Sequence, residues 1–167
     1  NEAIVTATRP VLLSAAVWPI HELDPAWDNF SGSPQQGNIH YYQDAKAWLV
    51  SDTIDSLSPM IYPAAYGTCD TDGNYVQGSD YWTQDRWQTL VDDFVADNNG
   101  RFIIPGIGAN YCSFAEIEAR INMARAANAA GHALFSYRHL EQNGYFDALK
   151  NGPYAQPAAL PEMTWRP

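Results

Sequence analysis

Four short apolar runs recur along the chain, and each is followed by a segment expected to be helical. The apolar runs cover residues 9–18, 53–63, 101–108 and 132–137. Helices are expected at residues 41–51, 84–97, 113–130 and 145–150. In the second helical segment Trp87, Leu90 and Val91 recur at the spacing of one helix face. Strands that alternate with helices predict a parallel sheet covered by helices, and therefore an α/β fold.

Two α/β architectures fit this alternation: an open doubly wound sheet and part of a (β/α)8 TIM barrel. A dinucleotide-binding doubly wound fold needs G-x-G-x-x-G after its first strand, and Gly106-Ile107-Gly108 stands at the third run without the last glycine. The long segments follow the strands and the short ones precede them, which is typical of the active face of a barrel. A barrel needs about 250 residues and eight units. Four units in 167 residues predict a half-barrel over residues 1–151 and a proline-rich tail over 152–167.

Charge and composition exclude several classes of partner. The chain has 9 Lys and Arg against 19 Asp and Glu, a formal net charge of −10, which disfavours nucleic acids and anionic membranes because both are polyanions. No apolar run approaches the about 20 residues of a membrane span. With 13% aromatic and 17% charged residues, the chain is also unlike a disordered protein.

Aromatic side chains are concentrated after the predicted strands, where a barrel binds its substrate. Flat aromatic rings bind ligands that offer an apolar face for stacking. Along the second strand, alternation places Met60 and Tyr62 opposite Leu57 and Ile61, which suit the helix-covered face. Met60 and Tyr62 are therefore expected to point into the barrel mouth. The predicted substrate-binding residues are Trp18, Met60, Tyr62, Tyr66, Asn110, Tyr111, Tyr137 and His139. Core packing is the alternative for Trp18, Met60, Tyr62 and Tyr137, and a plain surface position is the alternative for His139.

Five motifs in order resemble glycosyl-hydrolase-like family 10, a group of bacterial barrel proteins related to glycoside hydrolases. They are Leu13–Pro19, Tyr42–Asp44 leading to Trp48-Leu49, Ile54-Asp55 through Pro59–Tyr62, Ile104–Gly108, and Gly131 through Tyr137. The pattern Asp-x-x-x-Pro-Met-x-Tyr at residues 55–62 also resembles the sixth strand of family-18 chitinases. The resemblance implies strands five to eight of a TIM barrel and a glycan substrate. Members of the first family include enzymes that cut peptidoglycan strands stripped of their peptides.

Catalytic carboxylates are not identified in the sequence. Glycoside hydrolysis commonly uses two carboxyl groups that flank the scissile bond, and none of the four predicted strands ends in one. Asp55 stands at the start of its strand, so a structural hydrogen-bonding role is expected for it. In related barrels the acid/base pair lies at the end of the fourth strand, which a half-barrel of strands five to eight does not contain.

The two cysteines, Cys69 and Cys112, follow consecutive predicted strands and are expected to be neighbours at one face. A Cys69–Cys112 disulfide would imply an oxidising compartment, and hence a secreted, cell-surface or periplasmic protein. The alternative is two unpaired thiols.

No metal or cofactor is expected. The segment Asp70–Asn74 begins like a calcium-binding loop but lacks its sixth-position glycine and twelfth-position glutamate, and the four histidines have no zinc-like spacing.

The first and last strands of a half-barrel have unpaired edges, which favour aggregation. We therefore expect an amino-terminal half of the barrel, on the same precursor or on a separate chain. Two other functions remain open: a non-catalytic carbohydrate-binding or scaffold barrel in an extracellular assembly, and a self-sufficient flavodoxin-like domain.

Overall fold

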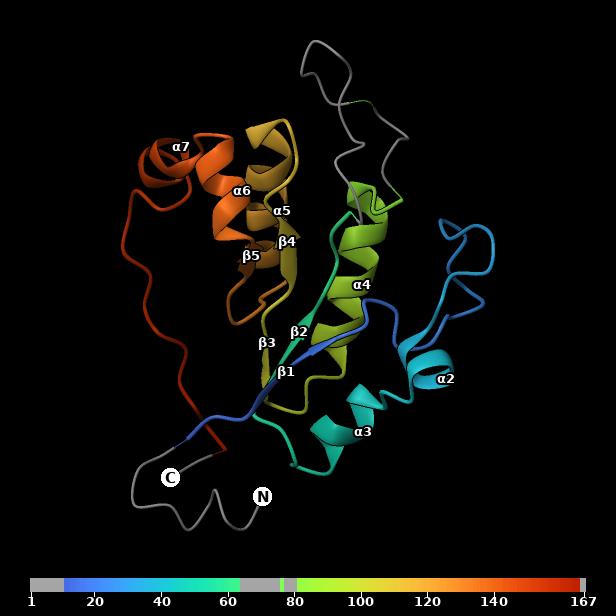
Figure 1. Ribbon diagram of the computed structural model, residues 1–167. Coiled ribbons are helices and arrows are strands. Elements are labelled where there is room, and N and C mark those ends of the chain that lie inside the picture. The colour runs from blue at the N-terminus through green and yellow to red at the C-terminus, as the bar shows by residue number, and fades with distance from the viewer. Residues whose placement is uncertain (1–10, 64–75, 77–80, 166–167) are drawn as a thin grey trace.

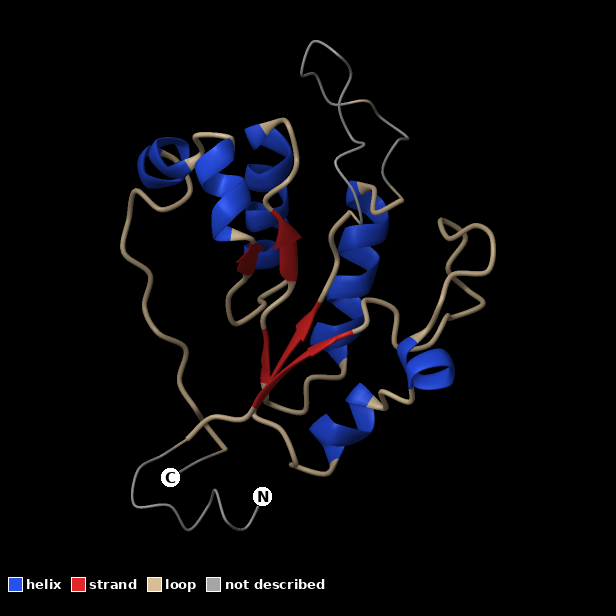
Figure 2. Cartoon of the chain, viewed as in Figure 1, coloured by secondary structure: helices blue, strands red, loops and turns tan. Residues whose placement is uncertain are grey.

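The computed structural model describes residues 11–63, 76 and 81–165, and they form an α/β structure with two small parallel sheets (Figures 1 and 2). The strands are β1 (Ser14–Val17), β2 (Ser56–Pro59), β3 (Phe102–Ile103), β4 (Gly106–Gly108) and β5 (Ala133–Phe135). The helices are α2 (Gly37–Tyr41), α3 (Ala45–Val50), α4 (Gln84–Ala96), α5 (Phe114–Ala126), α6 (Tyr137–Gln142) and α7 (Phe146–Asn151). The described part of the chain closes no barrel. None of its helices combines the length and the apolar character that crossing a membrane requires.

Within each sheet the strands pair in parallel with their neighbours along the chain, while β3 and β4 belong to different sheets. The first sheet has the order β1-β2-β3, with Ser14 opposite Ser56 and Ser56 opposite Phe102. The second sheet pairs β4 with β5, with Gly106 opposite Ala133. The order in each sheet follows the sequence without reversal.

The third apolar run is two strands rather than the one we expected. The Ile104 N–H still donates to the Leu57 carbonyl (2.8 Å), whereas the Pro105 carbonyl accepts from Ala133 (3.0 Å). Proline has no N–H to continue the ladder with β2. The run therefore changes partner at Pro105, from β2 on one side to β5 on the other.

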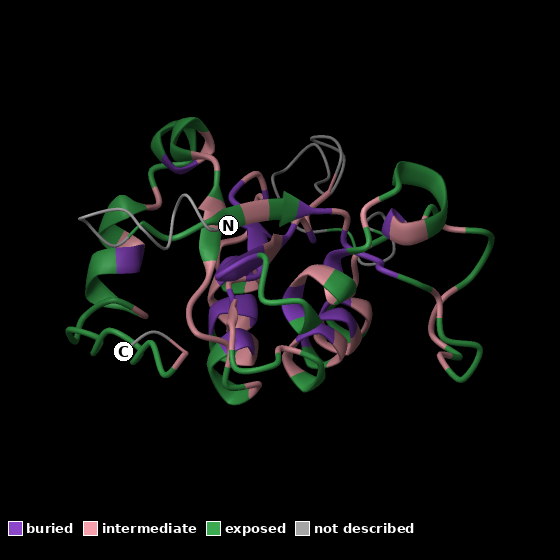
Figure 3. Ribbon diagram, turned by 90° about the horizontal axis from the view of Figure 1, so that it is seen from below, coloured by how far each residue is buried: buried purple, intermediate pink, exposed green. Residues whose placement is uncertain are grey.

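The core lies between the strands and the helices, where Figure 3 shows buried segments gathered at the centre of the molecule. Leu57 and Ile61 are fully buried, as the alternation predicted. Leu57 packs in a cluster with Leu49 of α3 and Phe94 of α4, and Ile61 belongs to a second cluster that includes residues of α4 and α5. The opposite face of the first strand is open, with Ser14 and Ala16 exposed.

The long helix predicted over 84–97 is confirmed within one residue as α4, because its apolar face is regular and Thr83 caps it: the hydroxyl accepts from the Arg86 N–H (3.5 Å). The prediction of a single helix over 41–51 is wrong, because the structure has two shorter helices, α2 and α3, in this region. Tyr42 adopts a left-handed conformation (φ 55°) that ends α2, and Asp44 then caps α3 by accepting from the Ala47 N–H (3.2 Å).

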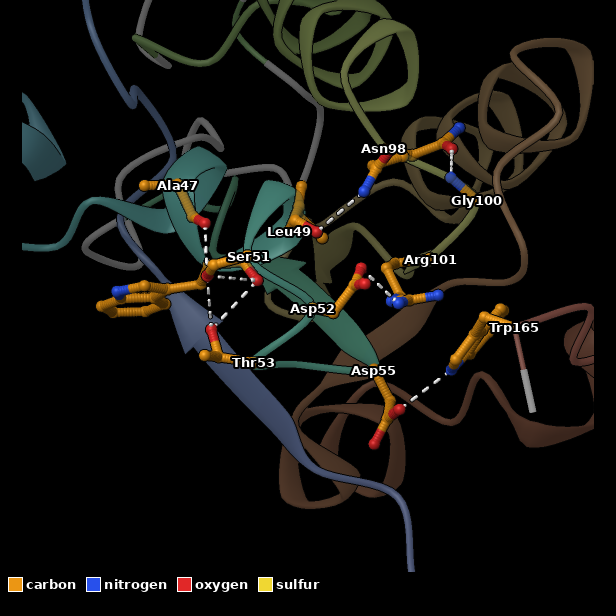
Figure 4. Close-up of polar contacts among 12 residues, drawn as sticks. Ala47, Leu49, Ser51, Asp52, Thr53, Asp55, Asn98, Gly100, Arg101 and Trp165 are labelled. Atoms are coloured by element: carbon orange, nitrogen blue, oxygen red, sulfur yellow. Dashed lines mark hydrogen bonds and ion pairs between the residues drawn. The ribbon is translucent and has the colours of Figure 1, made fainter. Parts of the chain in front are cut away.

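Asp55 holds the amino ends of the strands together (Figure 4). One carboxylate oxygen accepts from the Leu13 N–H (2.8 Å), ahead of β1, and the other accepts from the Trp165 indole N–H (2.9 Å). The Trp165 ring lies edge-on to Phe102, 4.6 Å between centroids, and the Arg101 guanidinium lies 4.9 Å from its centre. The structural role expected for Asp55 is confirmed, and the tail crosses back to the foot of the sheet.

Candidate functional site

A pocket of about 330 Å³ opens among the segments that follow β1 and precede α4. We call it the aromatic pocket, and it is lined by Trp18, Ser33, Pro34, Gln35, Tyr81 and Trp82. Trp18 directly follows β1, so the pocket lies at the carboxyl edge of the sheet. This is the edge at which parallel α/β folds place their ligands.

Trp18 is held by hydrogen bonds at its backbone and at its indole. Its backbone N–H donates to Gln43 Oε1 (2.8 Å), and its indole N–H donates to the Gln35 carbonyl (2.6 Å). The Tyr41 ring packs beside it, 4.3 Å between centroids at 31°. With its polar atom bonded to the backbone, the indole offers carbon surface to the pocket.

Arg86, in the first turn of α4, joins the two walls of the pocket. Its Nε donates to the Asn29 carbonyl (2.6 Å) and its Nη2 to Ser31 Oγ (3.1 Å), both in the segment after β1. Its Nη1 donates to the Tyr81 carbonyl (2.8 Å), in the opposite wall. The guanidinium carbon lies 4.3 Å from the centre of the Tyr81 ring, so Arg86 covers one face of that ring.

Arg120 of α5 fixes the backbone of Trp82 through a hydrogen bond. Its side chain is fully buried, and Nη2 donates to the Trp82 carbonyl (2.8 Å). Its charge is balanced by Glu116, whose carboxylate lies 2.7 Å from Nη1 and also accepts from Gln84 Nε2 (3.1 Å). The pocket wall is therefore anchored to two long helices.

A second aromatic surface lies on the strands themselves. Tyr62 stacks on Phe135 of β5, with ring centroids 5.1 Å apart and planes 11° from parallel. The ring covers Gly106, where an added Cβ would lie 2.9 Å from Tyr62 Cε1. Burial raises the pKa of the Tyr62 hydroxyl, so this group is neutral near pH 7 and can both donate and accept a hydrogen bond. Met60 and Tyr62 are both partly exposed.

The remaining predicted site residues lie in different surroundings. Asn110 Nδ2 donates to the Pro63 carbonyl (3.5 Å). Tyr111 is fully buried under the Arg120 guanidinium, 4.2 Å from its ring centre, so its ring has no face open to a sugar. Tyr137 is 67% exposed, but it begins α6 and packs on Phe146 instead of ending a strand.

His139 and Tyr66 complete the set. His139 lies in α6, where its Nδ1 is 3.5 Å from Ser136 Oγ, so it belongs to the helix rather than to the carboxyl end of β5. Tyr66 lies outside the described residues.

Sequence reasoning missed part of the aromatic pocket. Tyr81 and Trp82 stood among the loop aromatics but gave no sign that they would meet Trp18, which is more than 60 residues away in the chain. Gln35 and Phe135 were not selected either. Phe135 could have been found, because it ends the fourth strand two residues before Tyr137.

Among the described residues, no pair of hydrolytic groups is assembled at these aromatic surfaces. Glu116 is engaged by Arg120, and Asp55 lies at the opposite end of the strands. The described residues also contain no group of three or more histidine, cysteine, aspartate or glutamate side chains that could hold a metal ion. The aromatic pocket can bind and orient an apolar ring face, and its described lining contains no carboxylate.

The predicted disulfide has one end inside the described chain. Cys112 follows β4, and its carbonyl accepts from the Tyr145 hydroxyl (2.5 Å), which ties it to the α6–α7 hairpin. No described cysteine is a free thiol. Cys69 lies outside the described residues, so the Cys69–Cys112 pairing stays a prediction.

No protein-family model and no curated protein matches this chain. The resemblance to glycosyl-hydrolase-like family 10 therefore stays a prediction.

Proposed function

We propose that this chain forms one wall of a glycan-binding cleft in a barrel of the glycoside-hydrolase type. The aromatic pocket at the carboxyl edge of β1 carries the proposal. Trp18, Tyr81 and Trp82 surround a space of about 330 Å³, within the range of small-ligand sites. Stacked aromatic rings with a few polar neighbours are the surface that a pyranose fits.

The strand arrangement supports a barrel wall rather than a flavodoxin-like sheet. A doubly wound sheet reverses its strand order at a switch point. Here β1, β2 and β3 follow one another in order, and the continuation of β3 pairs with β5. The strand faces opposite the helices carry Ser14, Ala16 and Phe135, which are exposed. In a closed barrel such positions fill the interior.

An amino-terminal half, on the same precursor or on a separate chain, belongs to the proposal as the partner that supplies the other strands. The catalytic carboxylates would come from that half. The implied setting is a cell surface, a periplasm or the medium, and the implied substrates include peptidoglycan strands without peptides. These statements follow from the resemblance of the five motifs.

A non-catalytic carbohydrate-binding or scaffold barrel is the second candidate. The observation that favours it is that no described residue at the end of β1, β2, β4 or β5 is a carboxylate, and that Glu116 is engaged by Arg120. Digestion of glycan strands by the complete barrel separates the two: retention without cleavage favours the binding barrel.

The aromatic pocket is tested directly by calorimetric titration of oligosaccharides into the chain. Trp18→Ala should weaken binding by about 10-fold or more, because it removes both the buried apolar area and the stacking, which contributes roughly 0.5–1.5 kcal/mol beyond that area. Tyr154→Ala removes an exposed ring outside the pocket and serves as the control. Equal affinity of Trp18→Ala and the unchanged chain would refute the pocket as the binding site.

A further inference from the structure

None of the described residues that line the aromatic pocket carries a formal charge at neutral pH. Trp18, Ser33, Pro34, Gln35, Tyr81 and Trp82 are all uncharged side chains in their usual states. The Tyr81 hydroxyl is directed to the Ser31 carbonyl (3.3 Å). A ligand in this space meets ring carbon, a hydroxyl and an amide.

Two arginines that bond to the pocket wall, Arg86 and Arg120, are already engaged. Each guanidinium nitrogen of Arg86 donates to an oxygen of Asn29, Ser31 or Tyr81. Arg120 is fully buried and paired with Glu116. Either arginine would have to leave these bonds in order to meet a carboxylate of the ligand.

An acidic sugar would therefore enter the pocket at a cost. A carboxylate that loses water without gaining a cation or several donors is strongly disfavoured. The net charge of −10 adds a long-range repulsion of the same sign. A neutral sugar ring meets neither penalty.

We propose that the aromatic pocket selects an uncharged pyranose and rejects a carboxylate-bearing one. This inference rests on the proposed glycan-binding function and adds the chemical class of the sugar. In a glycan whose neutral and carboxylate-bearing sugars alternate, the pocket takes the neutral sugar of each pair.

The test compares a neutral ligand with the same ligand made acidic by carboxymethyl groups. A hexamer of β-1,4-linked N-acetylglucosamine and the same hexamer carboxymethylated at its 6-hydroxyls are titrated calorimetrically into the chain at about 20 mM and about 500 mM salt. We expect the neutral hexamer to bind at least 10-fold more tightly at low salt. High salt should narrow this difference, because it screens the long-range part of the repulsion.

Three variants test whether the neutral hexamer binds in the aromatic pocket. Trp82→Ala should weaken binding of the neutral hexamer by about 10-fold or more, and Trp82→Phe should recover much of it because a ring is kept. Trp165→Phe, at the opposite end of the strands, is the matched control and should leave the affinity unchanged. Circular dichroism of each variant establishes that its fold is retained.

The possible outcomes test the selectivity, the glycan-binding function and the assignment of binding to the aromatic pocket. If the carboxymethylated hexamer binds as tightly as the neutral one, or more tightly, the proposed selectivity is refuted and glycan binding is retained. Failure of both hexamers to bind overturns the glycan-binding function, and the selectivity with it. Neutral binding that Trp82→Ala leaves unchanged overturns the assignment to this pocket.

Discussion

At the scale of single residues, Gly106 and Gly108 allow the segment around Tyr62 to pack closely against β4. A Cβ on Gly108 would lie 2.6 Å from Asn110 Oδ1 and 2.8 Å from Pro63 Cδ. Gly108→Ala should therefore lower the free energy of unfolding by about 1–3 kcal/mol, because a proline ring held in the chain has little room to move. Gly131→Ala is the control, since nothing lies within 4 Å of its added Cβ. Urea denaturation measures both, and equal midpoints would contradict the packing described.

Asp55 and Trp165 make a second prediction at the same scale. Trp165→Phe keeps a ring beside Phe102 but removes the indole N–H that donates to Asp55. The loss of this hydrogen bond to a buried carboxylate should cost about 1.5–3 kcal/mol. Thermal unfolding checks the value. An unchanged melting temperature would mean that the tail does not stabilise the foot of the sheet.

At the scale of elements, a cluster of charges joins the segment after β1 to α3 and α4. Lys46 of α3 lies 2.7 Å from Asp93 of α4 and 2.7 Å from Asp97, which directly follows α4. Burial opposes the charge of Lys46, but hydrogen bonds to both aspartates outweigh it and raise the lysine pKa. His21 is buried beside this cluster, 3.7 Å from Asp44.

His21 gives the cluster a pH dependence. Burial first, and Lys46 second, lower the pKa of His21 below its ordinary 6.5. The unfolded chain then binds the proton more readily, so stability is complete above pH 6.5 and falls as the pH is lowered through 6.5 toward the folded-state pKa. His21→Gln should flatten this decline between pH 7 and 5 in denaturation curves, whereas His40→Gln, at an exposed position, is the control. A decline that His21→Gln leaves unchanged would assign it to other groups.

At the scale of the whole molecule, the open face and edge of β1 determine how the chain behaves alone. Among the described residues β1 pairs only with β2, and Val11, Leu12 and Leu13 are exposed beside it. An apolar edge of this kind favours association.

We expect the isolated chain to self-associate as its concentration rises. Ala16→Lys places a charge on the exposed face of β1 and should raise the concentration at which light scattering increases. Ala155→Lys, in the exposed tail, adds the same charge elsewhere and should change it less. Equal effects of the two variants would indicate that net charge alone controls association.

Prediction from sequence succeeded where a local pattern determines the structure. Trp87, Leu90 and Phe94 repeat at helical spacing, so α4 was located within one residue. Prediction from sequence failed where contacts between distant segments determine the structure. The change of partner at Pro105 depends on where β5 lies, and α6 lacks a long enough apolar repeat to be recognised.

The sequence by itself determined the α/β alternation, the helix-covered face of β2 and a structural role for Asp55, because periodicity and the position of a residue in its strand are local properties. Only the tertiary structure decided which aromatic residues meet. Trp18 and Trp82 line one pocket because Arg86 and Arg120 reach across the chain to backbone carbonyls, and such contacts depend on how the elements pack in space. The same packing buried Tyr111 under Arg120 and removed it from the surface.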